Sequence, residues 1–120
     1  MKAEELRKGN LIQRETYLGE WEQITYHPDR HHQIVNAPKQ FKPIELNPSW
    51  LERMGAEYDN YYYKFDDQIY IHYYENLDKS MDVFKGDENI LQDIKYVHQL
   101  QNLYFALTGK EIEIKQLEKV

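Results

Sequence analysis

Histidines and an aspartate form one candidate metal site in the sequence. The run from residue 27 to residue 32 contains the histidines His27, His31 and His32 together with Asp29. Imidazole nitrogens and carboxylate oxygens are ordinary ligands of zinc and nickel. However, Pro28 marks a turn, and a turn provides no helical or strand register that would fix the geometry of such ligands. We therefore interpret the run as a solvated loop and predict no metal site.

A second candidate for chemistry is His98, which lies among the amides of Gln99, Gln101 and Asn102. A histidine general base needs a partner within hydrogen-bond reach. His98 and Asn102 share one face of a helix, next to a stripe of apolar residues. The simpler interpretation is that they tie the helix to neighbouring backbone, because buried polar groups are generally hydrogen-bonded. We assign no catalytic residue and favour a noncatalytic protein over an enzyme.

Tyrosine is the most unusual feature of the composition. The chain has 11 tyrosines, and seven of them lie between Tyr58 and Tyr74. A tyrosine offers a large apolar ring with a hydroxyl group, which suits protein interfaces, self-association and stacking on a nucleobase. The explanations that stay open are a core and surface without a ligand, a protein interface that includes a homodimer, and a site for a small planar ligand such as a nucleotide. The predicted ligand- or partner-binding residues are Tyr62, Tyr70, His72 and Tyr74.

The elements that position these residues follow from hydrophobic spacing. In residues 1–46, short apolar segments separated by glycine-containing turns are typical of strands. Pro43 indicates an edge strand or the end of a strand. This part is expected to form a small curled β-sheet or half-barrel. Its predicted strands include Leu6, Leu11-Ile12, 21–26, Ile34-Val35 and 41–44.

The clearest local signal predicts a short helix between Asn47 and Gly55. Asn47 suits the N-cap, and Pro48 suits the first helical position. Gly55 suits the left-handed position that follows a helix. Trp50 and Met54 lie on one side of this helix and can bury it against a neighbour.

Alternating residues after this helix predict an antiparallel β-meander. Within 69–74, alternate side chains point to opposite faces, which separates Ile69, Ile71 and Tyr73 from Tyr70, His72 and Tyr74. One face is expected to pack on a helix and the other to be covered by tyrosine rings, a partner or a ligand. The predicted strands are 58–65, 69–74 and 80–85, with turns at 66–68 and 86–89.

The C-terminal part predicts a helix and then a strand. Apolar residues recur at helical spacing over 96–109, and Gly109 is the natural stop. Residues 111–115 alternate strictly, which favours a final strand with Ile112 and Ile114 inward. The expected fold class is therefore α+β: an N-terminal curled sheet or half-barrel, a short helix, and an antiparallel β-meander with one C-terminal helix packed on it, followed by a final strand.

The charge distribution bears on the partners. The formal charge is −6: residues 1–46 carry seven basic and seven acidic side chains, whereas 47–120 carry eight basic and 14 acidic ones. Binding to a phosphate backbone relies on clustered lysine and arginine, and no such cluster occurs in the sequence. An acidic surface also resists anionic membranes. We predict neither a nucleic-acid partner nor a membrane.

Length and composition predict one domain over 1–120, with a β-rich part at 1–46 and the remaining elements at 47–120. The sequence contains no cysteine, which excludes disulfides and thiolate metal sites and favours the cytoplasm. The N-terminal residues do not resemble a signal peptide, and no window approaches the ~20 apolar residues of a membrane span. No cofactor is expected.

Three blocks of sequence carry a family resemblance: "ELRKGNLI" at 5–12, "PIELNPSWLERMG" at 43–55 and "VHQLQNLYFALTGKEIEI" at 97–114. In this order they resemble a group of small proteins of Bacteroidota and of their phages and prophages. The resemblance spans nearly the whole chain, and its last block is the most specific. It implies a shared fold and a mobile-element origin, and it carries over no catalytic residue. The chain departs from the family pattern between the first two blocks, where the histidine-rich run lies.

The leading hypothesis is a noncatalytic protein-interaction module, derived from a phage or prophage, that binds a protein partner or itself through a tyrosine-rich sheet. The alternative is a small-ligand protein that binds or sequesters a nucleotide-like molecule and acts against host defence. A hydrolase that uses His98 or the run from His27 to His32 is the least favoured hypothesis.

Overall fold

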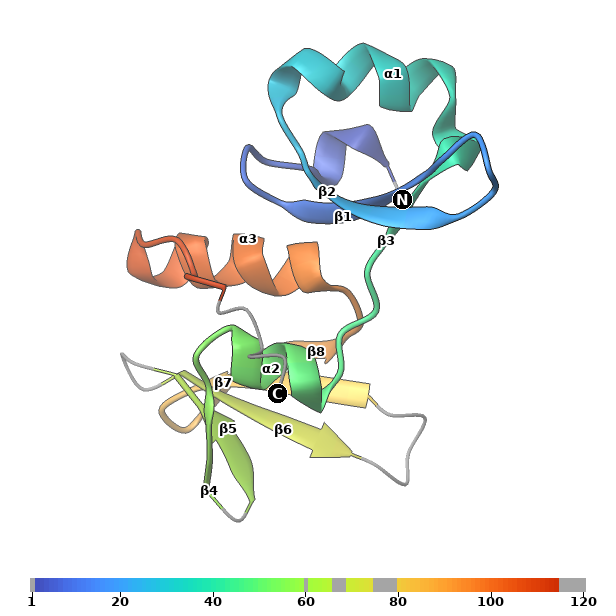
Figure 1. The fold of residues 1–120 in the computed structure, drawn as a ribbon. Helices are drawn as coiled ribbons and strands as arrows, with labels where there is room; N and C mark the ends of the chain where they lie inside the picture. Colours follow the sequence, from blue (N-terminus) through green and yellow to red (C-terminus); the bar gives the residue numbers. More distant parts are fainter. Residues whose placement is uncertain (1, 60, 66–68, 75–79, 115–120) are drawn as a thin grey trace. The chain divides into compact units, whose positions relative to one another are not determined.

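The computed structural model describes residues 2–59, 61–65, 69–74 and 80–114. The chain is an α+β protein with two antiparallel sheets, of three and five strands (Figure 1). Its backbone contacts divide it into two compact units. Residues 1–45 and 96–103 make up the N-terminal unit, and residues 46–95 and 104–120 make up the meander unit. The division falls within the long C-terminal helix, which contributes residues to both units.

The N-terminal unit is built on an open antiparallel sheet in the order β2-β1-β3. In the central strand, Ile12 pairs with Ile24 on one side and with Pro43 on the other. The helix α1 lies across one face of this sheet (Figure 1). The unit contains β1 (Leu11–Glu15), β2 (Trp21–Thr25), α1 (His31–Asn36), β3 (Phe41–Pro43) and the short 3₁₀ helices η1 (Ala3–Glu5), η2 (Pro28–Arg30) and η3 (Pro38–Gln40). Its buried core consists of Ala3, Ile12, Tyr26, Ile34 and Phe41.

The prediction of a strand at Leu6 is wrong, because this residue caps the 3₁₀ helix η1. The prediction of a strand at Ile34-Val35 is also wrong, because both residues lie in α1. Ile34 is buried, whereas Val35 is 55% exposed, so only one member of the pair faces the core. Two adjacent β-branched residues favour a strand locally, but their preference depends on the surface against which they pack. The predicted curled sheet is present, with three strands and no closed barrel.

The short helix predicted between Asn47 and Gly55 is confirmed as α2 (Pro48–Arg53). Asn47 caps it, since its side-chain oxygen accepts a hydrogen bond of 2.9 Å from the Trp50 N–H. Gly55 follows the helix with a φ of +95°, a conformation that costs glycine little. Leu51 is completely buried, so the helix is fixed by its packing as well as by its ends.

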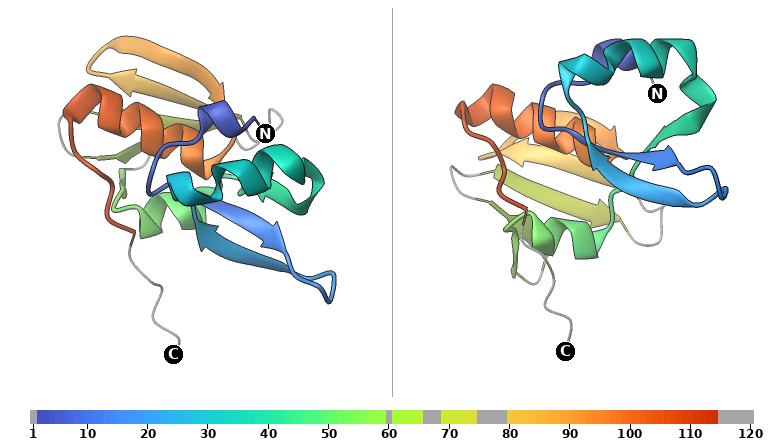
Figure 2. Two further views of the ribbon diagram at one scale, coloured as in Figure 1. Left: turned by 90° about the horizontal axis from the view of Figure 1, so that it is seen from above. Right: turned by 45° about the horizontal axis from the view of Figure 1, so that its top comes forward.

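The meander unit contains a five-stranded antiparallel sheet in the sequential order β4-β5-β6-β7-β8, and Figure 2 shows the neighbouring strands side by side. The predicted strands at 69–74 and 80–85 are confirmed as β6 (Ile69–Tyr74) and β7 (Ser80–Lys85). The predicted strand at 58–65 is instead two paired strands, β4 (Glu57–Asp59) and β5 (Tyr62–Lys64). The predicted turn at 66–68 lies outside the described residues.

The last strand of the sheet, β8 (Glu88–Ile94), is not anticipated by the sequence pattern. The prediction that 86–89 is only a turn is therefore too broad. Most of β8 is exposed, with Ile94 as its buried residue. It pairs with β7 through an irregular register, and the Asp82 carboxylate accepts a hydrogen bond of 2.9 Å from the Asp93 N–H. Pairing to β7 thus forms a strand whose own side chains do not alternate.

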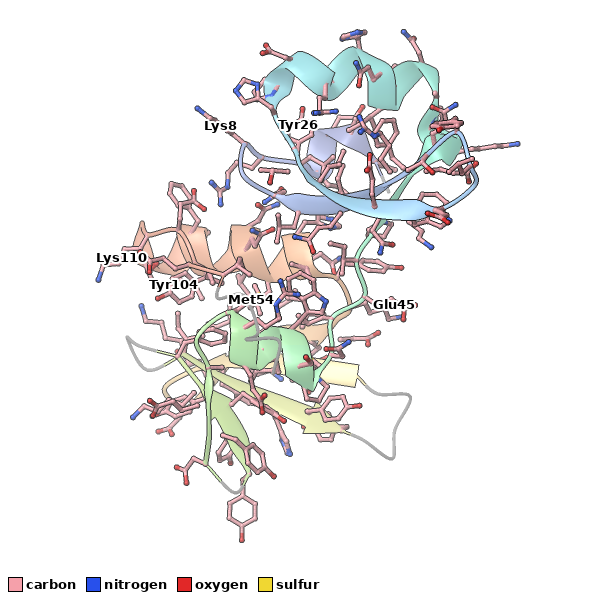
Figure 3. All side chains as sticks on the ribbon, in the orientation of Figure 1. Lys8, Tyr26, Glu45, Met54, Tyr104 and Lys110 are labelled. Atoms are coloured by element: carbon pink, nitrogen blue, oxygen red, sulfur yellow. The ribbon has the colours of Figure 1, made fainter. Side chains whose placement is uncertain are left out.

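The C-terminal helix α3 (Val97–Thr108) confirms the predicted helix, and Gly109 follows it with a φ of +73°. Its last turns pack in the meander unit, where the rings of Tyr104 and Phe65 are 5.7 Å apart (Figure 3). The predicted final strand is not formed over residues 111–114, although Ile112 is buried, and residue 115 lies outside the described residues. Alternation at the end of the chain therefore buries a side chain without forming a sheet ladder.

Candidate functional site

An aromatic face covers one side of β5 and β6. Side chains alternate along a strand, so Tyr62 on β5 lies on the same side as Tyr70, His72 and Tyr74 on β6. The Tyr62 ring is 6.0 Å from the Tyr70 ring and 5.5 Å from the His72 ring, and the His72 and Tyr74 rings are 4.2 Å apart. We call these residues the aromatic face. All the residues predicted to bind a ligand or partner lie in it, and their role stays a prediction.

The opposite side of the same strands is buried. Ile69 and Ile71 are at most 1% exposed, and Tyr63, which pairs with Ile71, is 9% exposed. Tyr62 in contrast is 40% exposed, and the other rings of the aromatic face are partly exposed. Since burial of the inner side determines which side chains face outward, the core of the meander unit holds the aromatic face in position.

Charged groups lie beside the aromatic face, one on β5 itself and one on the neighbouring strand β7. The Lys64 Nζ on β5 lies over the Tyr70 ring, 5.8 Å from its centroid. Asp82 on β7 pairs with His72 in the sheet register. Burial raises the pKa of the Tyr74 hydroxyl, and the charge and hydrogen bond of the Asp82 carboxylate raise that pKa further. Tyr74 therefore stays protonated at neutral pH and keeps a proton to donate.

A separate pocket of the meander unit gathers other tyrosines. It has a volume of ≈ 250 Å³. Three of its rings come from the consecutive strands β4, β5 and β6, the fourth comes from the turn before β5, and the first residue of α2 lies beside them. The Tyr58 and Tyr63 rings lie 4.9 Å apart, with a tilt of 44° between their planes. We call it the tyrosine pocket. It is lined by Pro48, Tyr58, Tyr61, Tyr63 and Tyr73.

The sequence-based choice of binding residues does not include the tyrosine pocket. Alternation along 58–65 and 69–74 separates Tyr63 and Tyr73 from the aromatic face, so this part of the signal was present in the sequence. Tyr58 reaches the pocket because β4 and β5 are two paired strands, with Tyr58 opposite Tyr63. Pro48 comes from α2, and its position beside these rings depends on the packing of that helix.

In the N-terminal unit, Gln101 of α3 binds the backbone ahead of β1. Its side-chain oxygen accepts a hydrogen bond of 2.9 Å from the Leu11 N–H, and its amide nitrogen donates one of 3.2 Å to the Gly9 carbonyl. Gln101 is 4% exposed, so its amide satisfies the buried Leu11 N–H and the part-buried Gly9 carbonyl from inside the unit. The interpretation of the amides on this helix as anchors is confirmed for Gln101.

Asn102 extends the same network. It donates a hydrogen bond of 2.9 Å to the Glu5 carbonyl and accepts one of 2.8 Å from the side chain of Asn10. Asn10 is fully buried and accepts a further hydrogen bond of 2.7 Å from the Arg7 N–H. Asn10 and Asn102 thus hold the segment that precedes β1 against α3 through specific polar contacts.

His98 completes this polar group and is 1% exposed. Its Nε2 lies 3.4 Å from a carboxylate oxygen of Glu5, and its ring stacks on that of Tyr96, with 5.9 Å between centroids and 9° between planes. Burial lowers the pKa of His98, and the hydrogen bond and charge of Glu5 oppose this effect. The contact of the enclosed imidazole is with a side-chain carboxylate, so within the part of the chain that the structure describes the predicted tie to neighbouring backbone is found for Asn102 and not for His98.

The lowered pKa of His98 predicts a loss of stability in acid. The unfolded chain binds a proton on this residue near pH 6.5, whereas the folded protein does so only at lower pH. The stability contributed by the neutral form is fully present above the unfolded pKa and is lost as the pH falls toward the folded pKa. We expect the free energy of unfolding, measured by urea denaturation between pH 8 and pH 5, to fall by up to about 1.4 kcal/mol per pH unit over this window.

The variant His98→Gln should flatten this part of the profile, because glutamine does not titrate. The matched control is His32→Gln, which removes an exposed histidine and should leave the profile unchanged. If both variants change the pH profile of stability equally, the loss of stability in acid does not come from His98.

The histidine-rich run is only partly the loop that was expected. Residues 28–30 form η2 and α1 begins at His31, while His27, His31 and His32 are exposed. The His27 Nδ1 lies 3.3 Å from an Asp29 carboxylate oxygen, and the His31 Nδ1 lies 3.1 Å from the Tyr26 hydroxyl. Across the described residues, no group of three or more histidine, aspartate or glutamate side chains is arranged to hold a metal ion.

The fold and these surfaces define an antiparallel α+β protein whose candidate binding groups are aromatic rings. Comparisons of the chain with protein-family models, with curated proteins and with solved structures find no match. No helix in the described part of the chain combines the length and apolar character needed to cross a membrane. The aromatic face and the tyrosine pocket are therefore the features from which we infer a function.

Proposed function

We propose that this chain is a noncatalytic interaction protein that associates with a second copy of itself through the aromatic face. The observation that carries this proposal is the continuous set of ring contacts from Tyr70 through Tyr62 and His72 to Tyr74. These rings lie on the side of the sheet opposite the buried core and remain partly exposed. Aromatic side chains dominate the energetics of protein interfaces.

A second copy is a suitable partner because tyrosine provides both an apolar surface and a hydrogen-bonding group. In a two-fold symmetric dimer the same patch occurs on both sides of the interface, so it must complement itself. The rings, with the opposite charges of Lys64 and Asp82 beside them, support such a self-complementary contact. A stable interface covers about 800 Å² on each partner, so the dimer has to include those side chains of β4 and β7 that lie on the same side of the sheet as the rings, such as Asp59 and Phe84.

The test is the oligomeric state of the triple variant Tyr62→Ser, Tyr70→Ser, Tyr74→Ser in sedimentation equilibrium. We expect the unaltered protein to be a dimer and the variant to associate at least about tenfold more weakly, because buried tyrosines are common hot spots. The matched control is Tyr58→Ser, which removes a 61% exposed tyrosine of the same sheet that lies in the tyrosine pocket. The control should remain dimeric.

Circular dichroism and thermal unfolding show whether the triple variant is folded, so that lost association is not confused with lost structure. An unaltered protein that stays monomeric at high concentration would contradict self-association. A folded triple variant with unchanged oligomeric state and unchanged partner binding would sink the proposal as a whole.

Two further parts of the proposal concern the origin of the chain and an alternative ligand. The resemblance of residues 97–114 to small proteins of Bacteroidota phages and prophages supports a mobile-element origin, with action in the cytoplasm of the host cell. The alternative function, binding or sequestration of a nucleotide-like ligand against host defence, would use the partly exposed rings of the aromatic face, on which a base can stack. Nucleotides that raise the melting temperature by several degrees would support this alternative, because a ligand of the native state stabilises it by mass action.

A further inference from the structure

We propose that the tyrosine pocket binds a small organic cation, in the form of a methylated ammonium or guanidinium group. Tyr58 from β4, Tyr63 from β5 and Tyr73 from β6 bring their rings to one depression, and Tyr61 and Pro48 complete its lining. The inference concerns different residues from the aromatic face and does not rest on self-association.

The size of the pocket favours a small group over a whole nucleotide. Its volume of ≈ 250 Å³ lies below the range of about 300–1,000 Å³ that is typical of sites for drug-sized ligands. A trimethylammonium or guanidinium group is compact and fits a space of this kind. A base, a sugar and phosphates together require more room than the pocket provides.

The lining suits a cation. The face of an aromatic ring carries partial negative charge and attracts ammonium and guanidinium groups. The Tyr58 and Tyr63 rings are tilted by 44° and lie 4.9 Å apart, so they do not stack flat on each other. Tyr58 and Tyr61 are 61% and 75% exposed, which leaves these rings accessible to a ligand from solution.

The charge of the surrounding unit favours the same class of ligand. The meander unit contains 14 acidic and eight basic side chains, whereas the N-terminal unit contains seven of each, so the whole formal charge of −6 belongs to the unit that holds the pocket. A potential of this sign attracts cations and opposes phosphates. Among the described residues, the lining contains no lysine or arginine that could reverse it.

The meander unit already places its own cations over aromatic rings. The Arg53 guanidinium lies 4.0 Å from the centroid of the Trp50 ring, and the Lys64 Nζ lies 5.8 Å from that of Tyr70. Both cations therefore have aromatic partners other than the pocket tyrosines. A cation held over an aromatic ring is therefore a kind of contact that this unit already makes.

The test compares choline with its neutral isostere 3,3-dimethylbutan-1-ol, by NMR titration of the full chain. The two molecules have nearly the same shape, and only choline carries a charge. We expect choline to shift tyrosine ring signals and to bind at least about fivefold more tightly than the alcohol, the factor that corresponds to about 1 kcal/mol. Equal affinities, or no shift with choline at 100 mM, would overturn the proposal.

Variants locate the binding to the pocket. Tyr58→Ala should weaken choline binding at least about fivefold, and Tyr58→Phe should preserve it because the ring face remains. The matched control is Tyr17→Ala, which removes a 96% exposed tyrosine of the N-terminal unit and should have no effect. If Tyr58→Ala binds choline as well as Tyr17→Ala does, the pocket is not the site.

Three probes distinguish the sources of the cation: free tetramethylammonium, phosphatidylcholine vesicles, and a peptide that contains trimethyllysine, each compared with guanidinium. Preference for the peptide indicates a modified protein partner, and preference for vesicles indicates a lipid headgroup. Failure of every probe overturns the inference while leaving the sedimentation result of the aromatic face untouched. Conversely, a monomeric protein that binds choline would retain this inference and reject self-association.

Discussion

Replacing Gln101 by leucine is expected to lower the free energy of unfolding by about 2–4 kcal/mol. The side chain of Gln101 satisfies the Leu11 N–H and the Gly9 carbonyl at a site that is 4% exposed. Leucine has a similar size but offers no hydrogen bond, so the buried Leu11 N–H and the part-buried Gly9 carbonyl would both lose this partner. Each such group costs about 1–3 kcal/mol. Urea denaturation followed by circular dichroism measures the change.

The matched control is Gln33→Leu, which makes the same substitution on α1, where Gln33 is exposed. This control should change stability by no more than about 0.5 kcal/mol. Hydrogen exchange adds a local readout, because the Leu11 amide should lose protection in Gln101→Leu and keep it in the control. If both variants are equally stable, the contacts of Gln101 do not anchor α3 to the segment before β1.

The second large effect is expected for Ile71→Ala, with a loss of about 2–5 kcal/mol. Ile71 is completely buried in β6 and pairs with Tyr63 on one side and Val83 on the other, both of which are buried. Removing its side chain leaves a cavity in the middle of the five-stranded sheet. The melting temperature and the denaturation midpoint should both fall.

Ile71 lies between Tyr70 and His72, so this variant also links the core to the aromatic face. A destabilised β6 should weaken self-association, although the altered side chain lies on the opposite side of the sheet. The control is Leu91→Ala, on the edge strand of the same sheet, where Leu91 is 41% exposed. Its cost should stay below about 1 kcal/mol, and an Ile71→Ala variant as stable as this control would contradict the assigned core.

The aromatic face and the tyrosine pocket can be tested separately because alternation divides the tyrosines. Tyr62 and Tyr70 contact each other on one side of the strands, and Tyr58 and Tyr63 contact each other in the pocket. A single sheet thus presents two chemically different surfaces. Serine in place of Tyr62 tests association, and alanine in place of Tyr58 tests cation binding.

The sequence by itself determined the elements whose signals are local. Asn47 and Gly55 mark the two ends of α2, and Gly109 follows α3. These signals are local because caps and left-handed positions depend on a few neighbouring residues. The bounds of β6 and β7 were likewise predicted from the sequence, and the two-residue period of a strand put Tyr70 and His72 on one side of the sheet. Each of these features follows from the period of a helix or strand.

Only the tertiary structure decided the features that depend on distant partners. Ile34 lies in a helix because its side chain packs into the core from there. The strand β8 forms because β7 provides hydrogen-bond partners for a segment whose own side chains alternate little. Gln101 reaches Leu11 across 90 positions of sequence. The tyrosine pocket likewise requires strand pairing and the packing of α2. Local periodicity specifies which side of an element is apolar, whereas packing specifies which other element meets it.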